Sequence, residues 1–172
     1  MKNNIILVGM MGAGKSFIGK ELKNSMPEMT HVDLDEYIER KKNMKIAEIF
    51  KNFGEEYFRK LESEAITELC KNCNLIISLG GGAYENSQNR VLLNASGYTI
   101  YLKASAEVLF NRIKNEKHRP LLKDGFGKEK IEEILDKRKL NYEKAMITID
   151  TTDKNSYNIV EEIKQRIAEY DR

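Results

Sequence analysis

Cysteine is scarce in this sequence, which has only Cys70 and Cys73 among its 172 residues. A lone C-x-x-C lacks the second ligand pair that a zinc site needs, and neither His31 nor His118 lies at zinc-finger spacing. A thioredoxin-type pair begins a helix, whereas this pair closes an expected helix just before a strand. We therefore interpret the pair as two ordinary thiols at a helix end.

Long hydrophobic runs are also missing. No stretch approaches the roughly 18 apolar residues that a membrane helix needs. Lys2 and the apolar run 5–13 resemble the start of a signal peptide, but Gly14-Lys15-Ser16 ends the run without a small-x-small cleavage site. We therefore expect an uncleaved cytoplasmic protein that does not enter a membrane.

No charge of one sign dominates. Lys and Arg total 29 against 27 for Asp and Glu, so the formal net charge is +2, and the basic residues are scattered instead of forming a block. This balance argues against a nucleic-acid partner. With 33% charged residues, 41% hydrophobic residues and two prolines, the chain is typical of one folded domain over residues 1–172. We expect it to be a monomer.

Short apolar runs alternate with segments of helical period, which predicts an α/β fold with a parallel sheet between helices. The expected strands are Ile5–Val8, His31–Leu34, Leu75–Leu79, Thr99–Leu102 and Ile147–Ile149. The expected helices are Lys15–Ser25, Glu36–Lys41, Lys45–Phe53, Glu55–Lys71, Ser87–Asn94, Ala106–Lys114, Lys128–Tyr142 and Tyr157–Tyr170.

A polar segment with a proline and two glycines interrupts this alternation at about residues 115–127. Loops of this length in a compact domain are usually functional or disordered. We interpret the segment as a mobile lid that carries Arg119.

The stretch Gly9-Met10-Met11-Gly12-Ala13-Gly14-Lys15-Ser16 matches the P-loop pattern G-x-x-x-x-G-K-[ST] over residues 9–16. It follows an expected strand and opens an expected helix, as the pattern requires. The glycines let backbone N–H groups face phosphates at a helix N-terminus. Lys15 can neutralise β- and γ-phosphates, and the Ser16 hydroxyl suits Mg²⁺, so the chain is expected to bind ATP and Mg²⁺.

The acceptor side must separate kinases from the other P-loop classes. The guanine-reading tetrapeptide N-K-x-D of GTPase switches is absent. The chain instead carries Asp33-Leu34-Asp35, Phe58-Arg59, Gly80-Gly81-Gly82, Arg119-Pro120-Leu121-Leu122, and Arg138 followed four residues later by Tyr142. In this combination and order the chain closely resembles the shikimate kinase family over nearly its whole length.

The resemblance implies a three-layer P-loop kinase fold with a five-stranded parallel sheet and a lid, similar to nucleoside monophosphate kinases. It implies direct transfer of the ATP γ-phosphate to the 3-hydroxyl of shikimate with Mg²⁺, a step of aromatic amino-acid biosynthesis. The expected partners are therefore the small molecules ATP and shikimate.

The resemblance also assigns roles to individual residues. Lys15, Asp35 and Arg119 are the expected catalytic residues, and Ser16 and Asp33 the expected metal ligands. Nucleotide binding is expected of Gly12, Ala13, Gly14, Lys15, Ser16, Phe17, Arg112 and Arg119. Acceptor binding is expected of Asp35, Arg59, Gly80, Gly81, Gly82 and Arg138.

Several of these residues have simpler alternatives. Asp35 can be a turn or helix cap, and Arg59 and Arg138, each taken alone, are more typical of a solvated surface. The Gly80–Gly82 stretch can be a flexible turn, and Phe50 and Phe58 can be core residues instead of packing around the acceptor ring. Glu62 can orient Arg59 or form an ordinary surface pair.

Asp33 and Asp35 lie two residues apart in an expected extended strand end, so they are predicted to face the same side. The resemblance implies that Ser78 reaches Mg²⁺ through water. The sequence departs from the family after the last expected strand, where Asp150–Ser156 contains no proline, which predicts a looser adenine site and a less strict preference for ATP. Rival hypotheses are another small-molecule kinase, for gluconate or nucleotides, and a slow ATP-hydrolysing binding module.

Overall fold

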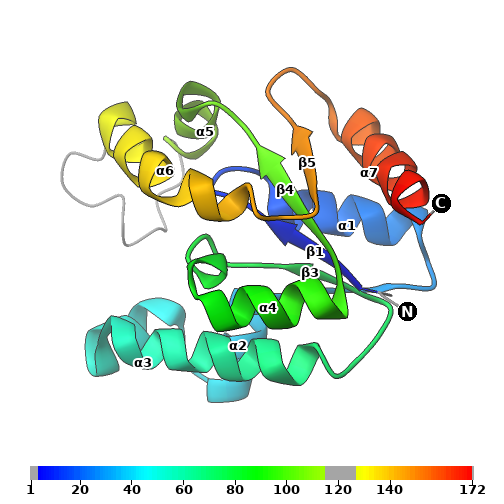
Figure 1. Ribbon diagram of the computed structural model, residues 1–172. Helices are drawn as coiled ribbons and strands as arrows, with labels where there is room; N and C mark the ends of the chain where they lie inside the picture. The colour runs from blue at the N-terminus through cyan, green and yellow to red at the C-terminus, as the bar shows by residue number, and fades with distance from the viewer. Residues whose placement is uncertain (1–3, 115–126, 172) are drawn as a thin grey trace.

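Five parallel strands form the central sheet of the computed structural model, which describes residues 4–114 and 127–171 (Figure 1). The strand order is β2-β3-β1-β4-β5. The strands are β1 (Asn4–Val8), β2 (Thr30–Asp33), β3 (Leu75–Ser78), β4 (Gly97–Lys103) and β5 (Ile147–Asp150). The predicted five-stranded parallel sheet is therefore confirmed.

The central strand β1 is buried along its whole length, which explains its continuous apolar sequence. Its register places Ile6 beside Ile77 of β3 and Thr99 of β4. The polar exception, Asn4, donates to the Asn72 carbonyl at 2.9 Å and accepts from the Leu75 N–H at 2.9 Å. Hydrogen bonding thus compensates the one polar side chain of the central strand.

Helices cover both faces of the sheet, which gives three layers. Helices α1 and α7 lie side by side on one face, and α4 covers the other face with α3 packed against it (Figure 1). Helix α6 packs against α5 and against the short helix η1. The bounds are α1 (Lys15–Ser25), α2 (Leu34–Lys42), α3 (Ile46–Leu69), η1 (Ala83–Glu85), α4 (Ser87–Ser96), α5 (Ala106–Ile113), α6 (Lys128–Tyr142) and α7 (Ser156–Tyr170).

Helix α2 begins earlier than the sequence predicted. Asp33 is its N-cap, and the Asp33 carboxylate accepts from the N–H groups of Asp35 at 3.1 Å and Glu36 at 3.3 Å. Asp35 therefore lies in the first helical turn. The prediction that Asp33 and Asp35 share an extended strand end and one facing direction is wrong, because the cap turns the chain into a helix immediately after β2.

Two predicted helices, 45–53 and 55–71, join into α3 across a break at Gly54. Gly54 has φ 82° and ψ 175°, a conformation that side chains other than hydrogen strongly disfavour. The predicted boundary at this glycine is real, although the chain resumes a helix at once. Arg59 and Glu62 lie on the part of α3 that follows the break.

The predicted lid and Arg119 lie outside the described residues, apart from Gly127 at the start of α6. Cys70 and Cys73 are free thiols at the C-terminal end of α3, where burial raises the pKa of Cys70. Among the helices described here, none is long and apolar enough to cross a membrane.

Candidate active site

The P-loop runs from the end of β1 into α1. Gly12 and Gly14 have φ values of 80° and 85°, so both need the left-handed freedom of glycine, and Gly14 is the N-cap of α1. The Lys15 ammonium donates to the carbonyls of Gly9 at 2.8 Å and Met10 at 2.9 Å. The loop therefore folds around its own lysine and surrounds the start of α1 with N–H groups, an arrangement that suits phosphate.

Ser16 and Asp33 come together from different elements. The Ser16 hydroxyl donates a hydrogen bond to the Asp33 carboxylate, which links the first turn of α1 to the end of β2. The other oxygen of the Asp33 carboxylate caps α2. A hydroxyl and a carboxylate beside a phosphate-binding loop are hard oxygen ligands, so this donor pair fits Mg²⁺.

Ser78 and His31 contact α1, the helix that begins at Lys15. The buried Ser78 hydroxyl donates to the Lys15 carbonyl at 3.0 Å, and His31 Nε2 lies 3.0 Å from the same hydroxyl. A Cβ on Gly19 would lie 2.4 Å from His31 Nε2, so only glycine admits the ring at this point of α1. The hydroxyl that was expected to reach Mg²⁺ through water is thus engaged with the backbone of α1. Sequence reasoning missed the His31 contact.

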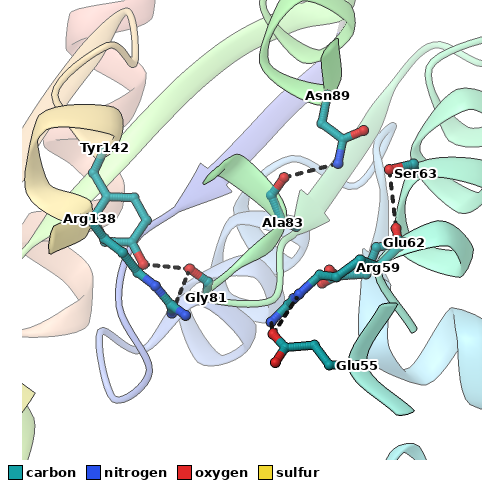
Figure 2. A network of polar contacts seen from close by, with 9 residues as sticks. All are labelled: Glu55, Arg59, Glu62, Ser63, Gly81, Ala83, Asn89, Arg138 and Tyr142. Atoms are coloured by element: carbon teal, nitrogen blue, oxygen red, sulfur yellow. Dashed lines mark hydrogen bonds and ion pairs between the residues drawn. The ribbon is translucent and has the colours of Figure 1, made fainter. Parts of the chain in front are cut away.

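The three glycines after β3 form a turn that two arginines approach from opposite sides (Figure 2). A Cβ on Gly82 would lie 2.6 Å from Arg59 Nη1, and a Cβ on Gly81 would lie 3.5 Å from Arg138 Nη1. The missing side chain of Gly82 therefore leaves space for the Arg59 guanidinium group, whereas the distance at Gly81 is an ordinary contact distance. The structure brings Arg59, Arg138 and the glycine turn together, although they are separated widely in the sequence.

Arg59 is held by two glutamates of its own helix. Its Nη1 donates to Glu62 at 2.5 Å, and its Nε and Nη2 donate to one oxygen of Glu55 at 3.2 and 2.9 Å. Glu62 is only 1% exposed, whereas the Glu55 side chain is 65% exposed. The buried Glu62 therefore holds Arg59 in place, which is one of the two roles considered for it, and the additional contact with Glu55 was not foreseen.

Two carboxyl groups converge beside Gly80. A Cβ on Gly80 would lie 3.0 Å from Glu62 Oε1 and 3.1 Å from Asp35 Oδ1. Burial, together with the charge of Asp35, raises the pKa of Glu62 to about 7 against the opposing effect of Arg59. This part of the site can therefore accept hydrogen bonds from hydroxyl groups, and its charge changes near neutral pH.

Arg138 is held differently from Arg59. Its Nη1 donates to the Gly81 carbonyl at 3.2 Å, and the Tyr142 hydroxyl donates to the same carbonyl at 2.5 Å (Figure 2). The partner of Arg138 is a neutral carbonyl, whereas Arg59 contacts two acidic groups. Arg138 consequently keeps more of its positive potential for an anionic ligand.

The remaining predicted residues fall into separate groups. Arg112 Nη2 donates to the Thr151 carbonyl at 3.1 Å, so Arg112 meets the segment after β5 where the sequence departs from the family. The Phe17 side chain is 58% exposed, so its backbone N–H in the first turn of α1 is the group suited to phosphate. Phe50 and Phe58 pack together with ring centroids 4.8 Å apart, and Phe58 is buried in the core.

The shikimate kinase family model matches residues 11–168. A shikimate kinase of Sulfurihydrogenibium sp. (strain YO3AOP1) is 42% identical over 164 residues, covering 95% of this chain and 97% of the relative. A solved shikimate kinase of Acinetobacter baumannii in complex with shikimate has a TM-score of 0.91 and 34% identity, covering 98% of this chain and 94% of that one. A gluconokinase of Sinorhizobium meliloti 1021 has a TM-score of 0.61 at 12% identity, covering 98% of this chain and 93% of that one, and shares the fold alone.

Proposed function

This chain belongs to the shikimate kinase family, and we propose that it transfers the γ-phosphate of ATP to the 3-hydroxyl of shikimate. The products are 3-phosphoshikimate and ADP, and the reaction is a step of aromatic amino-acid biosynthesis. We further propose that the enzyme acts as a cytoplasmic monomer, with Arg119, outside the described residues, as the lid arginine.

The pair of arginines beside the glycine turn is the observation that carries this assignment. A guanidinium group is charged at all relevant pH values and binds a carboxylate through two parallel hydrogen bonds. Arg59 and Arg138 both contact the small space around Gly81 and Gly82. A carboxylated acceptor offers a charged group to which both guanidinium groups can donate when they turn from their protein partners, whereas an uncharged polyol offers none.

The nucleotide side supplies positive charge and N–H donors. Lys15 lies at the first turn of α1, and its ammonium group can exchange the carbonyls of Gly9 and Met10 for the β- and γ-phosphates. Because the transition state of phosphoryl transfer spreads negative charge over the equatorial oxygens, groups fixed around them lower the barrier. Gly12, Ala13 and Gly14 provide the loop, and Arg112 lies on the adenine side.

Ser16 and Asp33 are the residues that would hold Mg²⁺. Held there, Mg²⁺ would supply positive charge that offsets the charge of the phosphates. The hydrogen bond between these two residues keeps their oxygens adjacent before any ligand binds.

Asp35 is the residue suited to the attacking hydroxyl. Its Oδ1 lies close to Gly80, at the turn that also bears the arginines. A carboxylate at this position accepts the hydrogen bond of a hydroxyl and directs an oxygen lone pair at the γ-phosphate. Transfer is direct and in line, without a phosphoenzyme.

An acceptor panel tests the proposal. The purified chain is incubated with ATP and Mg²⁺ and with shikimate, gluconate or a nucleoside monophosphate, and products are identified by mass spectrometry. We expect phosphorylation of shikimate, with ADP release that depends on it. A rate that shikimate leaves unchanged while gluconate or a nucleotide raises it would overturn the assignment, and ADP release indifferent to all acceptors would favour a nucleotide-dependent binding module.

A further inference from the structure

The Gly81 carbonyl receives two hydrogen bonds from α6. The Tyr142 hydroxyl lies 2.5 Å from this oxygen and Arg138 Nη1 lies 3.2 Å from it (Figure 2). Arg138 and Tyr142 are four residues apart, so they project from one face of α6. Arg138 and the buried phenol of Tyr142 therefore donate to the same backbone carbonyl.

The Gly81 carbonyl lies in a run of three glycines, which is the most flexible type of backbone. Gly80, Gly81 and Gly82 carry no side chains, and glycine loses more conformational freedom on ordering than any other residue. A substrate that contacts this turn is bound well only if the turn is already ordered. Tyr142 is suited to order it because its side chain is fully buried and its ring packs on Tyr101 with centroids 5.2 Å apart.

We propose that Tyr142 is a positioning residue for the acceptor carboxylate: its hydroxyl fixes the Gly81 carbonyl so that Arg138 can turn to the ligand. The inference rests on the proposed function and extends it to a residue with no direct contact to substrate. It explains why a phenol, and not a phenyl ring, stands one turn after Arg138.

The physical reason is the free-energy cost of leaving the Gly81 carbonyl without a hydrogen-bond donor. When Arg138 directs its donors to a carboxylate, the Gly81 carbonyl loses one of its two hydrogen bonds. Tyr142 still donates to it, so no polar group is left without a partner. Burial raises the pKa of Tyr142 to about 12, so the hydroxyl keeps the proton that it donates. Without this hydroxyl, Arg138 would be the only one of the two donors left, and binding of the phosphate acceptor would take that one away as well.

Tyr142→Phe tests the inference, with Tyr101→Phe as the matched control. Each change deletes one hydroxyl from the same pair of stacked rings, but only Tyr142 bonds Gly81. We expect Tyr142→Phe to raise KM for shikimate roughly 5- to 30-fold while kcat and KM for ATP change less than threefold. Tyr101→Phe should leave all three constants within threefold of wild type.

A purely structural role for Tyr142 predicts a different pattern, namely a lower melting temperature with unchanged KM for shikimate, and that pattern would overturn the inference. If Tyr142→Phe unfolds near assay temperature, shikimate binding is measured calorimetrically at 10 °C, where a Kd within threefold of wild type would likewise refute it. The double variant with Arg138→Lys should lose less than the sum of the single losses. Wild-type turnover of shikimate, measured alongside, distinguishes failure of this inference from failure of the proposed function.

Discussion

Arg59 Nη1 lies 2.5 Å from Glu62 Oε2, and this glutamate is almost completely buried. The ion pair thus joins a half-exposed cation to a carboxylate withdrawn from water. Removing a buried ionic partner costs more than removing an exposed one, because the remaining charge is left without compensation. Glu62 therefore determines where Arg59 can point, and also how the site responds to pH.

Glu62→Gln should change the pH dependence of stability. The folded pKa of about 7 lies above the ordinary value of 4.5, so between these values the folded protein holds a proton that the unfolded chain releases. The free energy of unfolding contributed by this group is therefore fully present below pH 4.5 and falls as pH rises through 7. Between pH 5 and pH 8, the free energy of unfolding measured in urea should fall less in Glu62→Gln than in wild type.

The control Glu64→Gln, on the exposed face of α3, should match wild type. Equal losses in all three proteins would refute the assignment.

Replacing Arg59 or Arg138 by lysine keeps the positive charge but removes the forked geometry of the guanidinium group. A hydrogen bond to a charged group is worth about 1.5–3 kcal/mol, so kcat/KM for shikimate should fall roughly 10- to 150-fold in each variant. We expect the larger loss for Arg138→Lys, because Arg59 is already neutralised by Glu55 and Glu62. KM for ATP is the internal control. An analogue with a neutral group in place of the carboxylate should discriminate poorly between the proteins. A kcat/KM for shikimate within threefold of wild type in both variants would show that the carboxylate is held elsewhere.

Gly82→Ala should weaken acceptor binding while sparing the fold. The new methyl group would lie 2.6 Å from Arg59 Nη1, the end of a flexible side chain, and Gly82 has φ −102°, which alanine adopts freely. We expect KM for shikimate to rise about 10-fold with little change in melting temperature. In Gly97→Ala the methyl group would lie 2.2 Å from the Asn4 backbone oxygen, so that variant should instead lose about 2 kcal/mol or more of stability. An unaltered shikimate KM in folded Gly82→Ala would remove the glycine turn from the site.

Lys15→Ala should abolish phosphoryl transfer. The ammonium group lies within the P-loop, where it donates to the carbonyls of Gly9 and Met10, and its loss should lower kcat at least roughly 100-fold. The purified variant should keep the circular dichroism spectrum of the wild type but melt at a lower temperature, because the carbonyls of Gly9 and Met10 lose their ammonium donor. Near-normal turnover by the folded variant would contradict the assignment of the P-loop.

The sequence predicted the sheet well because parallel strands such as Ile5–Val8 are buried on both faces and read as continuous apolar runs. It predicted the wrong geometry for Asp33 and Asp35, since periodicity does not reveal that the Asp33 carboxylate caps α2. The burial of Glu62 and the bond from Ser78 to the Lys15 carbonyl depend on contacts between distant segments, which a single sequence does not display. The prediction that Arg59 and Arg138 belong to one site came from the family resemblance and not from the periodicity of the sequence.

The break in α3 at Gly54 and the glycine turn after β3 both belong to the stretch between β2 and α4. Asp35, Arg59 and the three glycines all lie in this stretch, which the chain runs through without interruption, whereas Lys15 precedes it and Arg138 follows it. Most of the residues proposed to bind the phosphate acceptor therefore lie in one continuous segment of the chain. Transplanting residues 34–86 into a related phosphotransferase would carry over Asp35, Arg59 and the glycine turn in one exchange, together with the Ser78 hydroxyl that bonds to the Lys15 carbonyl, whereas Arg138 would have to be transferred separately.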